Sequence, residues 1–213
     1  FNGRRAGARI EDLSDNQDLA SKGEHKHFML KEIVEQPEIA RRALEADIKF
    51  PKPSRVTLVA CGTAYHAALI GKHLFEQEGV EARAEIASEF RYRHFPVTQN
   101  ELFIAISQSG ETADTLAAMR HAKQLGMKTC ALINSPNSTM MREADVAIPT
   151  HAGPEIAVAY TKAFISQLAT LYNITKDSSK LKDVPMQIRK VLEARERVRE
   201  IAAKYNDFKN FMY

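Results

Sequence analysis

Short apolar runs alternate with longer amphipathic stretches through the middle of the chain. The runs are rich in Val, Ile, Leu and Ala and have the length of buried strands. The predicted strands are Arg55–Ala60, Glu81–Ala87, Glu101–Ser107, Lys128–Ile133 and Asp145–Pro149. The predicted helices are Ala64–Gly79, Glu111–Leu125, Thr161–Asn173 and a short helix before the last strand. Because strands separated by helices join through right-handed crossovers, we expect an α/β fold with a five-stranded parallel sheet flanked by helices, a three-layer αβα arrangement.

The N-terminal part of the chain follows a different pattern. Residues 1–23 are interrupted by Gly, Ser, Asp and Asn and have little apolar periodicity, so we predict a linker or tail. From His27 the spacing becomes helical. Pro37 is predicted to begin a second helix, because Pro is tolerated in a first helical turn. These N-terminal helices and the sheet are expected to form one module over residues 24–205.

The C-terminal part is helical and highly charged. Pro185–Lys204 carries one apolar stripe among charged residues, which predicts a single helix with the stripe in the core. Residues 206–213 turn β-like, and we expect them to be the truncated start of a following segment.

Composition excludes several classes of protein. The chain has 213 residues, of which 44% are hydrophobic and 27% charged, so a core can form and wholesale disorder is excluded. A formal net charge of +3 is too small to indicate nucleic acid or a membrane surface as a partner. No run approaches the ~18 consecutive apolar residues of a transmembrane helix. Two cysteines, Cys61 and Cys130, are too few for a disulfide framework, so we expect a cytoplasmic location.

Two polar loops follow predicted strands. Cys61–Ala64 follows the first strand, and Ser107–Thr112 follows the third with three hydroxyls, an amide and a glycine. In parallel sheets ligands bind at this edge, and free amides at a helix N-terminus favour an anion such as phosphate. An ordinary turn with Ser109 as the helix cap explains the same residues, so both interpretations stay open from spacing alone. Neither a Walker loop nor a Gly-x-Gly-x-x-Gly fingerprint is present.

Several motifs resemble, in the same order, those of the glutamine–fructose-6-phosphate aminotransferases (isomerizing). Ser107–Thr112 (SQSGET) by itself is similar to the phosphate loop of the wider group of sugar isomerase (SIS) domains. The more specific matches are HFMLKEIVEQP at 27–37, CGT at 61–63, EIASEFRYR at 85–93, SQSGETADTL at 107–116 and TKAF at 161–164. The resemblance covers nearly all of residues 24–205.

The resemblance implies a fold, an activity and partners. The fold is that of a SIS domain, and this chain corresponds to the linker and the first of two SIS modules. The family's enzymes convert fructose 6-phosphate and glutamine-derived ammonia to glucosamine 6-phosphate. Expected partners are a sugar phosphate, a glutaminase domain, the second SIS module and a second copy in a homodimer. No cofactor, metal, nucleic acid or membrane is implied, and the catalytic groups are expected outside this chain, which alone should be inactive.

The resemblance also implies the site residues. Those expected to bind substrate are Thr63, Ser107, Gln108, Ser109, Thr112 and Val158, with Glu155 and Lys162 in the same segment as Val158. Ala64 and Tyr160 stand where the family usually has serine, so two expected hydroxyls are missing. These two departures leave open a related SIS sugar-phosphate isomerase or deglycase, or a non-catalytic sensor of amino-sugar phosphates. His25 and His27 form an isolated pair, which is more typical of a solvated linker than of a metal site.

Overall fold

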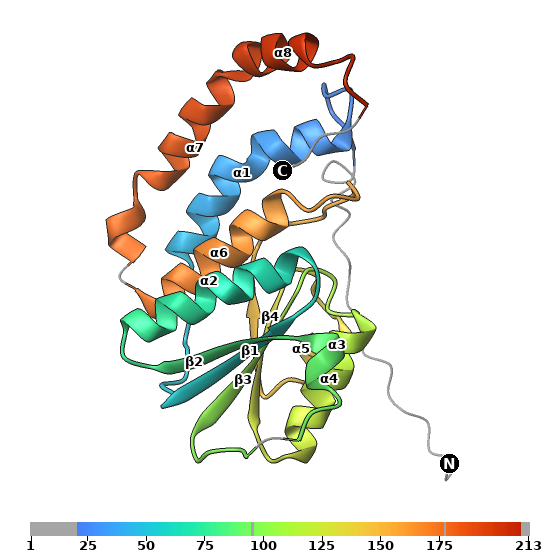
Figure 1. The fold of residues 1–213 in the computed structure, drawn as a ribbon. Helices are drawn as coiled ribbons and strands as arrows, with labels where there is room; N and C mark the ends of the chain where they lie inside the picture. Colours follow the sequence, from blue (N-terminus) through green and yellow to red (C-terminus); the bar gives the residue numbers. More distant parts are fainter. Residues whose placement is uncertain (1–20, 95, 177, 210–213) are drawn as a thin grey trace, which may run out of the picture.

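Five parallel strands form one sheet in the order β2-β1-β3-β4-β5 (Figure 1). The computed structural model describes residues 21–94, 96–176 and 178–209. The strands are β1 (Arg55–Ala60), β2 (Glu81–Ile86), β3 (Glu101–Ser107), β4 (Lys128–Ile133) and β5 (Val146–Pro149). The predicted parallel αβα fold is therefore confirmed.

Helices cover both faces of the sheet. The helices are α1 (Phe28–Glu45), α2 (Thr63–Gln77), α3 (Ala87–Phe90), α4 (Ala113–Gln124), α5 (Thr139–Glu143), α6 (Lys162–Thr175), α7 (Val184–Glu193) and α8 (Arg195–Lys204), with a 3₁₀ turn at Ser178–Leu181. Buried side chains of α2 and α6 share one apolar cluster with the sheet, and those of α3, α4 and α5 share another. Successive residues of β3 point to opposite faces of the sheet: Leu102 and Ile104 belong to the first cluster, while Phe103 and Ala105 belong to the second.

Helix α1 packs beside α6, and the two run in the same direction. Near their N-termini Lys162 Nζ bonds Glu35 at 2.6 Å, and near their C-termini the Asn173 amide donates to the carbonyls of Ala43 and Ala46, both at 2.9 Å. The latter bonds satisfy carbonyls that a helix end leaves free. Two segments more than a hundred residues apart in sequence are thereby joined.

The predicted break at Pro37 is wrong, because α1 continues through this residue as a single helix. An interior proline costs about 3 kcal/mol by removing one helical hydrogen bond. Pro37 is buried, and α1 packs along both α6 and α7, so the gain in packing outweighs the lost bond.

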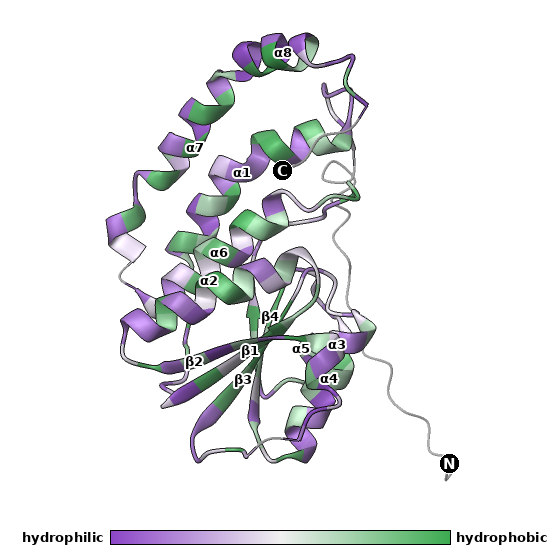
Figure 2. Cartoon of the chain, in the orientation of Figure 1, coloured by the Kyte–Doolittle hydropathy of each residue, from purple (hydrophilic) through white to green (hydrophobic). Residues whose placement is uncertain are grey.

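The prediction for Pro185–Lys204 is wrong in two respects. The segment forms two helices that meet at Ala194, and no residue of either helix is buried. Hydrophobic and hydrophilic residues alternate along both helices in Figure 2, and Val191 and Val198 are 72% and 62% exposed. Arg195 lies in the middle of the apolar stripe and interrupts it where α7 gives way to α8. No strand is present at residues 206–209, while 210–213 and the predicted linker residues 1–20 lie outside the described residues.

Glu101, the first residue of β3, is bonded to side chains of the two other strands on its side of the sheet, β1 and β2. Its carboxylate, with the side chain fully buried, accepts hydrogen bonds from Thr57 Oγ1 at 2.8 Å, Arg83 at 2.7 Å, and both the amide and the hydroxyl of Thr98. Burial alone raises the pKa of Glu101, but the bonds from Thr57, Thr98 and Arg83 outweigh burial and leave that pKa below its ordinary value. This network lies at the amino edge of the sheet, opposite the loops that follow the strands.

Replacing Glu101 with glutamine should lower the free energy of unfolding at pH 7 by about 1.5–3 kcal/mol, because charge-assisted bonds are lost. Since the folded pKa is depressed, the stabilisation is complete above the unfolded pKa of about 4.3 and is lost as the pH falls through the folded value. Urea unfolding of both proteins at pH 7 and pH 3 measures this. The control Glu81→Gln removes an exposed carboxylate at the same edge and should change little. An equal loss for Glu101→Gln at the two pH values would contradict the prediction.

Candidate functional site

Two polar loops flank the point where the strand order reverses. Strands β1 and β3 are neighbours, but β1 leads into α2 on one face of the sheet and β3 leads into α4 on the other. The loops Cys61–Ala64 and Ser107–Thr112 therefore lie at the same carboxyl edge, where the chain turns to opposite faces, and Thr115 Oγ1 of α4 lies 3.8 Å from Cys61 Sγ. The sheet thus brings together the two loops that the sequence singled out.

The loop after β3 is ordered by its own hydroxyl groups. Ser107 Oγ accepts from the amide of Gly110 at 3.1 Å and lies 3.1 Å from Thr112 Oγ1. Ser109 Oγ accepts from the amide of Glu111 at 3.2 Å. Because Thr112 is the residue that precedes α4, Ser109 is not its N-cap, and the turn interpretation offered from sequence is wrong in that respect. The contact between Ser107 and Thr112 uses the proton of one of these two hydroxyls, and a bound anion would have to replace that contact for all three hydroxyls to donate to it.

The turn after β4 is hydrogen-bonded to the backbone of the loop after β3. The carbonyl of Gln108 accepts from the amides of Asn134 and Ser135 at 3.2 and 3.0 Å, so the backbone of the loop is held from one side. The side chains of Gln108 and Ser109 are half-buried. Sequence reasoning missed this role of Asn134, although its position directly after a buried strand was a usable signal.

Gly110 lies against the turn after β4 with almost no space. Its φ is +67°, and a Cβ built there would lie 2.2 Å from Ser138 Oγ and 2.6 Å from Ser138 Cβ. The Gly110 carbonyl accepts from the amide of Met140 at 3.2 Å. Only glycine satisfies both the backbone conformation and the close approach. The loop is consequently locked to the start of α5.

Glu111 adds a second tie to α5. Its Oε1 accepts from the amide of Thr139 at 2.7 Å. The bonds from the backbone and side chain of Thr139 lower the pKa of Glu111, so the residue stays ionised at neutral pH. Its negative charge is engaged with α5 rather than with the neighbouring hydroxyls.

The first turn of α4 completes the donor set. The helix's first internal bond runs from the amide of Leu116 to the carbonyl of Thr112, so the preceding amides of the turn are not used by the helix. The loop itself contains no Lys or Arg. An anion here would be held by hydroxyl groups, peptide amides and the helix dipole.

The loop after β1 contributes Thr63, which is half-buried at the first position of α2. Its neighbour Ala64 is buried and packs into the core cluster beneath α2. Cys61 is half-buried, packs against the apolar cluster of α3, α4 and α5, and its Sγ accepts a weak hydrogen bond from Thr115 Oγ1 at 3.8 Å. Cys130 is buried, and burial raises its pKa to about 12, which makes its thiol unreactive.

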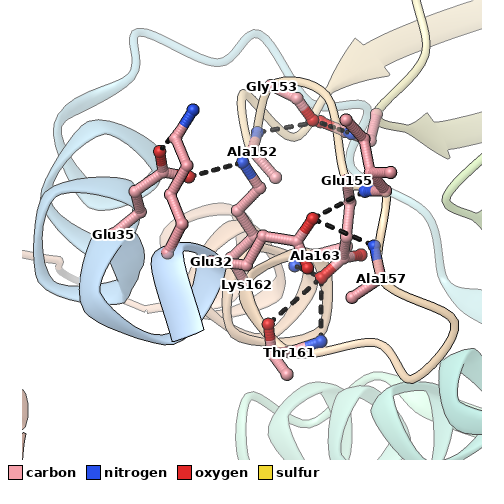
Figure 3. Close-up of polar contacts among 12 residues, drawn as sticks. Glu32, Glu35, Ala152, Gly153, Glu155, Ala157, Thr161, Lys162 and Ala163 are labelled. Carbon is pink, nitrogen blue, oxygen red and sulfur yellow. Dashed lines mark hydrogen bonds and ion pairs between the residues drawn. The ribbon is translucent and has the colours of Figure 1, made fainter. Parts of the chain in front are cut away.

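The remaining predicted residues lie on the segment from β5 to α6 (Figure 3). Val158 is 99% exposed and Tyr160 is 41% exposed. Glu155 Oε1 accepts from the amide of Thr161 at 2.8 Å, and Lys162 is buried and bonds Glu35 at 2.6 Å. Lys162 Nζ and Glu155 Oε1 are therefore bonded within the chain, whereas Glu155 Oε2 is buried and has no hydrogen-bond partner among the described residues, and Val158 faces solvent.

The described residues contain neither a candidate metal site nor a candidate membrane-spanning helix. Among residues 21–94, 96–176 and 178–209, no three His, Cys, Asp or Glu side chains are grouped so that they could hold a metal ion. Over the same residues, no helix combines the length and apolar character needed to cross a bilayer.

Comparison with known proteins assigns the fold to a family. The SIS domain family matches residues 49–175, from the connector before β1 to the end of α6. The chain belongs to the SIS domain family. The matched segment contains both polar loops and the segment from β5 to α6.

Curated relatives of this SIS domain chain confirm the resemblance seen in the motifs. It is 38% identical over 226 residues to a glutamine–fructose-6-phosphate aminotransferase (isomerizing) of Bartonella henselae, and the match covers 92% of this chain. It is 42% identical over 211 residues to the protein of that name from Aquifex aeolicus, covering 91% of this chain. The chain spans 37% and 36% of the length of these two relatives.

Solved structures agree with the SIS fold. The C-terminal domain of glucosamine-fructose-6-phosphate aminotransferase from Francisella tularensis superposes with a TM-score of 0.77 at 36% identity. The superposition covers 88% of this chain and 62% of that one. Tagatose-6-phosphate ketose/aldose isomerase from Escherichia coli gives 0.65 at 17% identity over 79% of this chain and 54% of that one, which shows a shared fold.

Replacing Gly110 with alanine should destabilise the chain by about 1–3 kcal/mol more than the same change at Gly126, because the new Cβ must displace Ser138. Gly126 is a matched control, since its φ is +83° and nothing lies within 4 Å of an added Cβ. Its substitution isolates the cost of the positive φ, about 1–3 kcal/mol. Chemical denaturation of both variants measures the difference. Equal losses would show that Ser138 yields freely and would contradict the close approach.

Proposed function

We propose that this chain is the first SIS module of a glutamine–fructose-6-phosphate aminotransferase and that it holds the phosphate of the substrate. The observation that carries the proposal is the loop Ser107–Thr112, which presents three hydroxyls and unused helix amides at the strand-order reversal. The similarity of most of the chain to enzymes of that name supports the same substrate class.

The proposed division of labour follows from the groups present. In the whole enzyme, ammonia from glutamine would reach the open-chain ketose phosphate, and the resulting imine would isomerise to the 2-amino aldose phosphate. This chain would bind and orient the phosphate end, while a glutaminase domain and a second SIS module would supply the chemistry. A homodimer and a cytoplasmic location belong to the same proposal.

The expected affinity for the phosphate follows from the number of uncharged hydrogen-bond donors that could bind it. Thr63, Ser107, Ser109 and Thr112 would each donate one hydrogen bond, and Gln108 would add its amide. Three or four charge-assisted bonds at ~1.5–3 kcal/mol each give a gross gain of about 5–12 kcal/mol. Immobilising the ligand costs about 4 kcal/mol or more. The difference favours millimolar binding by this chain alone.

The sugar itself would meet the segment from β5 to α6. Val158 is proposed to line it, because its side chain is 99% exposed and free to accept an apolar contact. Lys162 and Glu155 would act on the ligand only indirectly, since Lys162 Nζ and Glu155 Oε1 are bonded within the chain and Glu155 Oε2 is buried.

A second candidate function is a related SIS sugar-phosphate isomerase or deglycase. It is favoured by Ala64 and Tyr160, which stand where the resemblance leads us to expect serines: Ala64 is buried in the core cluster beneath α2 and lacks the hydroxyl, and Tyr160 has a bulky, partly exposed phenol. Both functions use the same phosphate grip, so they differ in the sugar accepted. Comparing fructose 6-phosphate with other hexose phosphates in one titration separates them.

We expect this chain to bind fructose 6-phosphate in the millimolar range and Ser109→Ala to weaken binding about tenfold or more, since one bond to a charged group is lost. Calorimetric titration at millimolar protein measures both values. Ser54→Ala is the matched control, because Ser54 lies beside the amino edge of the sheet and donates there to backbone carbonyls. The chain alone should form no glucosamine 6-phosphate. Absence of binding to every hexose phosphate, or an unchanged affinity for Ser109→Ala, would overturn the proposed grip.

A further inference from the structure

A carboxylate on α1 is inserted into the loop between β5 and α6. Glu32 is 2% exposed, and its Oε1 accepts from the amide of Ile156 at 2.6 Å and from the amide of Ala157 at 3.1 Å (Figure 3). The bonded residues are 124 and 125 positions apart in sequence. Val158, which we propose to line the sugar, is the next residue after these two amides.

From this geometry we infer that Glu32 is a positioning residue for substrate: it fixes the loop that presents Val158 and so sets the affinity for the sugar part of a hexose phosphate. The inference deepens the proposed function and rests on it. Neither the motifs nor the names of the similar proteins assign any role to this glutamate.

The loop has three separate anchors, and Glu32 provides the middle one. At the start, the Asn134 side chain donates to the carbonyl of Gly153 at 2.6 Å and accepts from the amide of Ala152 at 2.8 Å. At the end, Glu155 Oε1 accepts from the amides of Thr161 and Ala163. Between these anchors, Glu32 holds the backbone immediately before the exposed residues 158–160.

Burial makes the carboxylate dependent on this loop. Glu32 Oε2 is buried and, within the described residues, has no hydrogen-bond partner, so the two loop amides compensate the desolvation of the group. Two N–H donors aligned on one carboxylate oxygen define the loop conformation much more narrowly than apolar contacts would. Displacement of the loop would leave the carboxylate buried and unsatisfied, which opposes such movement.

A neighbouring ion pair keeps the carboxylate in place. One helical turn along α1, Glu35 bonds the buried Lys162 at the first position of α6. This pair holds α1 against α6 next to the point where Glu32 reaches the loop. Glu32 therefore extends from a fixed support, as a group that positions another must.

The role can be separated from a purely structural one with two ligands. Inorganic phosphate would use only the loops after β1 and β3, which Glu32 does not contact, whereas fructose 6-phosphate would also use the segment from β5 to α6. Glu32→Ala should weaken fructose 6-phosphate binding by this chain about tenfold and leave inorganic phosphate binding unchanged. Amide hydrogen exchange at Ile156 and Ala157 should accelerate in the same variant, while exchange in β1 and β3 stays as in the wild type.

Two further variants sharpen the test. Glu32→Gln keeps an acceptor oxygen and should stay within about threefold of the wild-type affinity for fructose 6-phosphate. Glu38 lies on the same helix, and its carboxylate pairs with Arg41 and Arg42 at the surface. Glu38→Ala is the control and should change the binding of neither ligand.

The outcomes distinguish the two proposals. If wild-type chain binds neither ligand, the proposed function fails and the inference falls with it. If the wild type binds both and Glu32→Ala binds fructose 6-phosphate equally well, the inference alone is overturned. Equal weakening of both ligands would show that Glu32 acts on the whole fold rather than on this loop, and would also overturn it.

Discussion

The adjacency of β1 and β3 in a parallel sheet determines where the polar loops of this protein meet. Their following helices lie on opposite faces, so the chain diverges at the carboxyl edge of the sheet. Everything polar at that edge depends on this divergence. The apolar clusters on the two faces maintain it, because each helix is held by its own set of buried residues.

At this edge of the sheet the loops are organised by backbone amides and uncharged side chains, and Ser107–Thr112 contains no Lys or Arg. Ser107, Ser109 and Thr112 organise one loop through short-range bonds. The turn after β4 holds that loop from outside, through Gln108 and Gly110. The carboxylate of the adjacent Glu111 bonds the amide of Thr139 and ties the loop to α5. For the proposed phosphate grip, this bond means that the nearest negative charge is already engaged within the chain.

Local pattern predicted the sheet well and the peripheral helices poorly. The strands Arg55–Ala60, Glu101–Ser107 and Lys128–Ile133 have the predicted bounds, because each is a buried apolar run that ends in a polar or glycine-containing loop. Pro37 was misjudged because a helix break is a local rule, and packing along α6 and α7 overrides it. The C-terminal stripe was misjudged because periodicity shows that a helix has an apolar face but not what covers that face.

Only the part of the candidate site that is formed by residues contiguous in sequence could be predicted. Ser107–Thr112 is contiguous in sequence, so its chemistry could be read before its geometry was known. The contact of Glu32 with Ile156 and Ala157 joins the first helix to the last loop, and a single glutamate in an amphipathic helix carries no signal of such a contact. Val158 was likewise predicted as a site residue from the resemblance alone, and that prediction did not include the contact of Glu32 with the two residues before it.

The contact between Gly110 and Ser138 has a consequence for how this protein can change over generations. A side chain at position 110 requires a smaller residue at 138 first, and that residue also caps α5 through the amide of Met141. A larger residue at position 110 alone is therefore disfavoured, and a tolerated change there would need a compensating change at position 138, in the turn after β4.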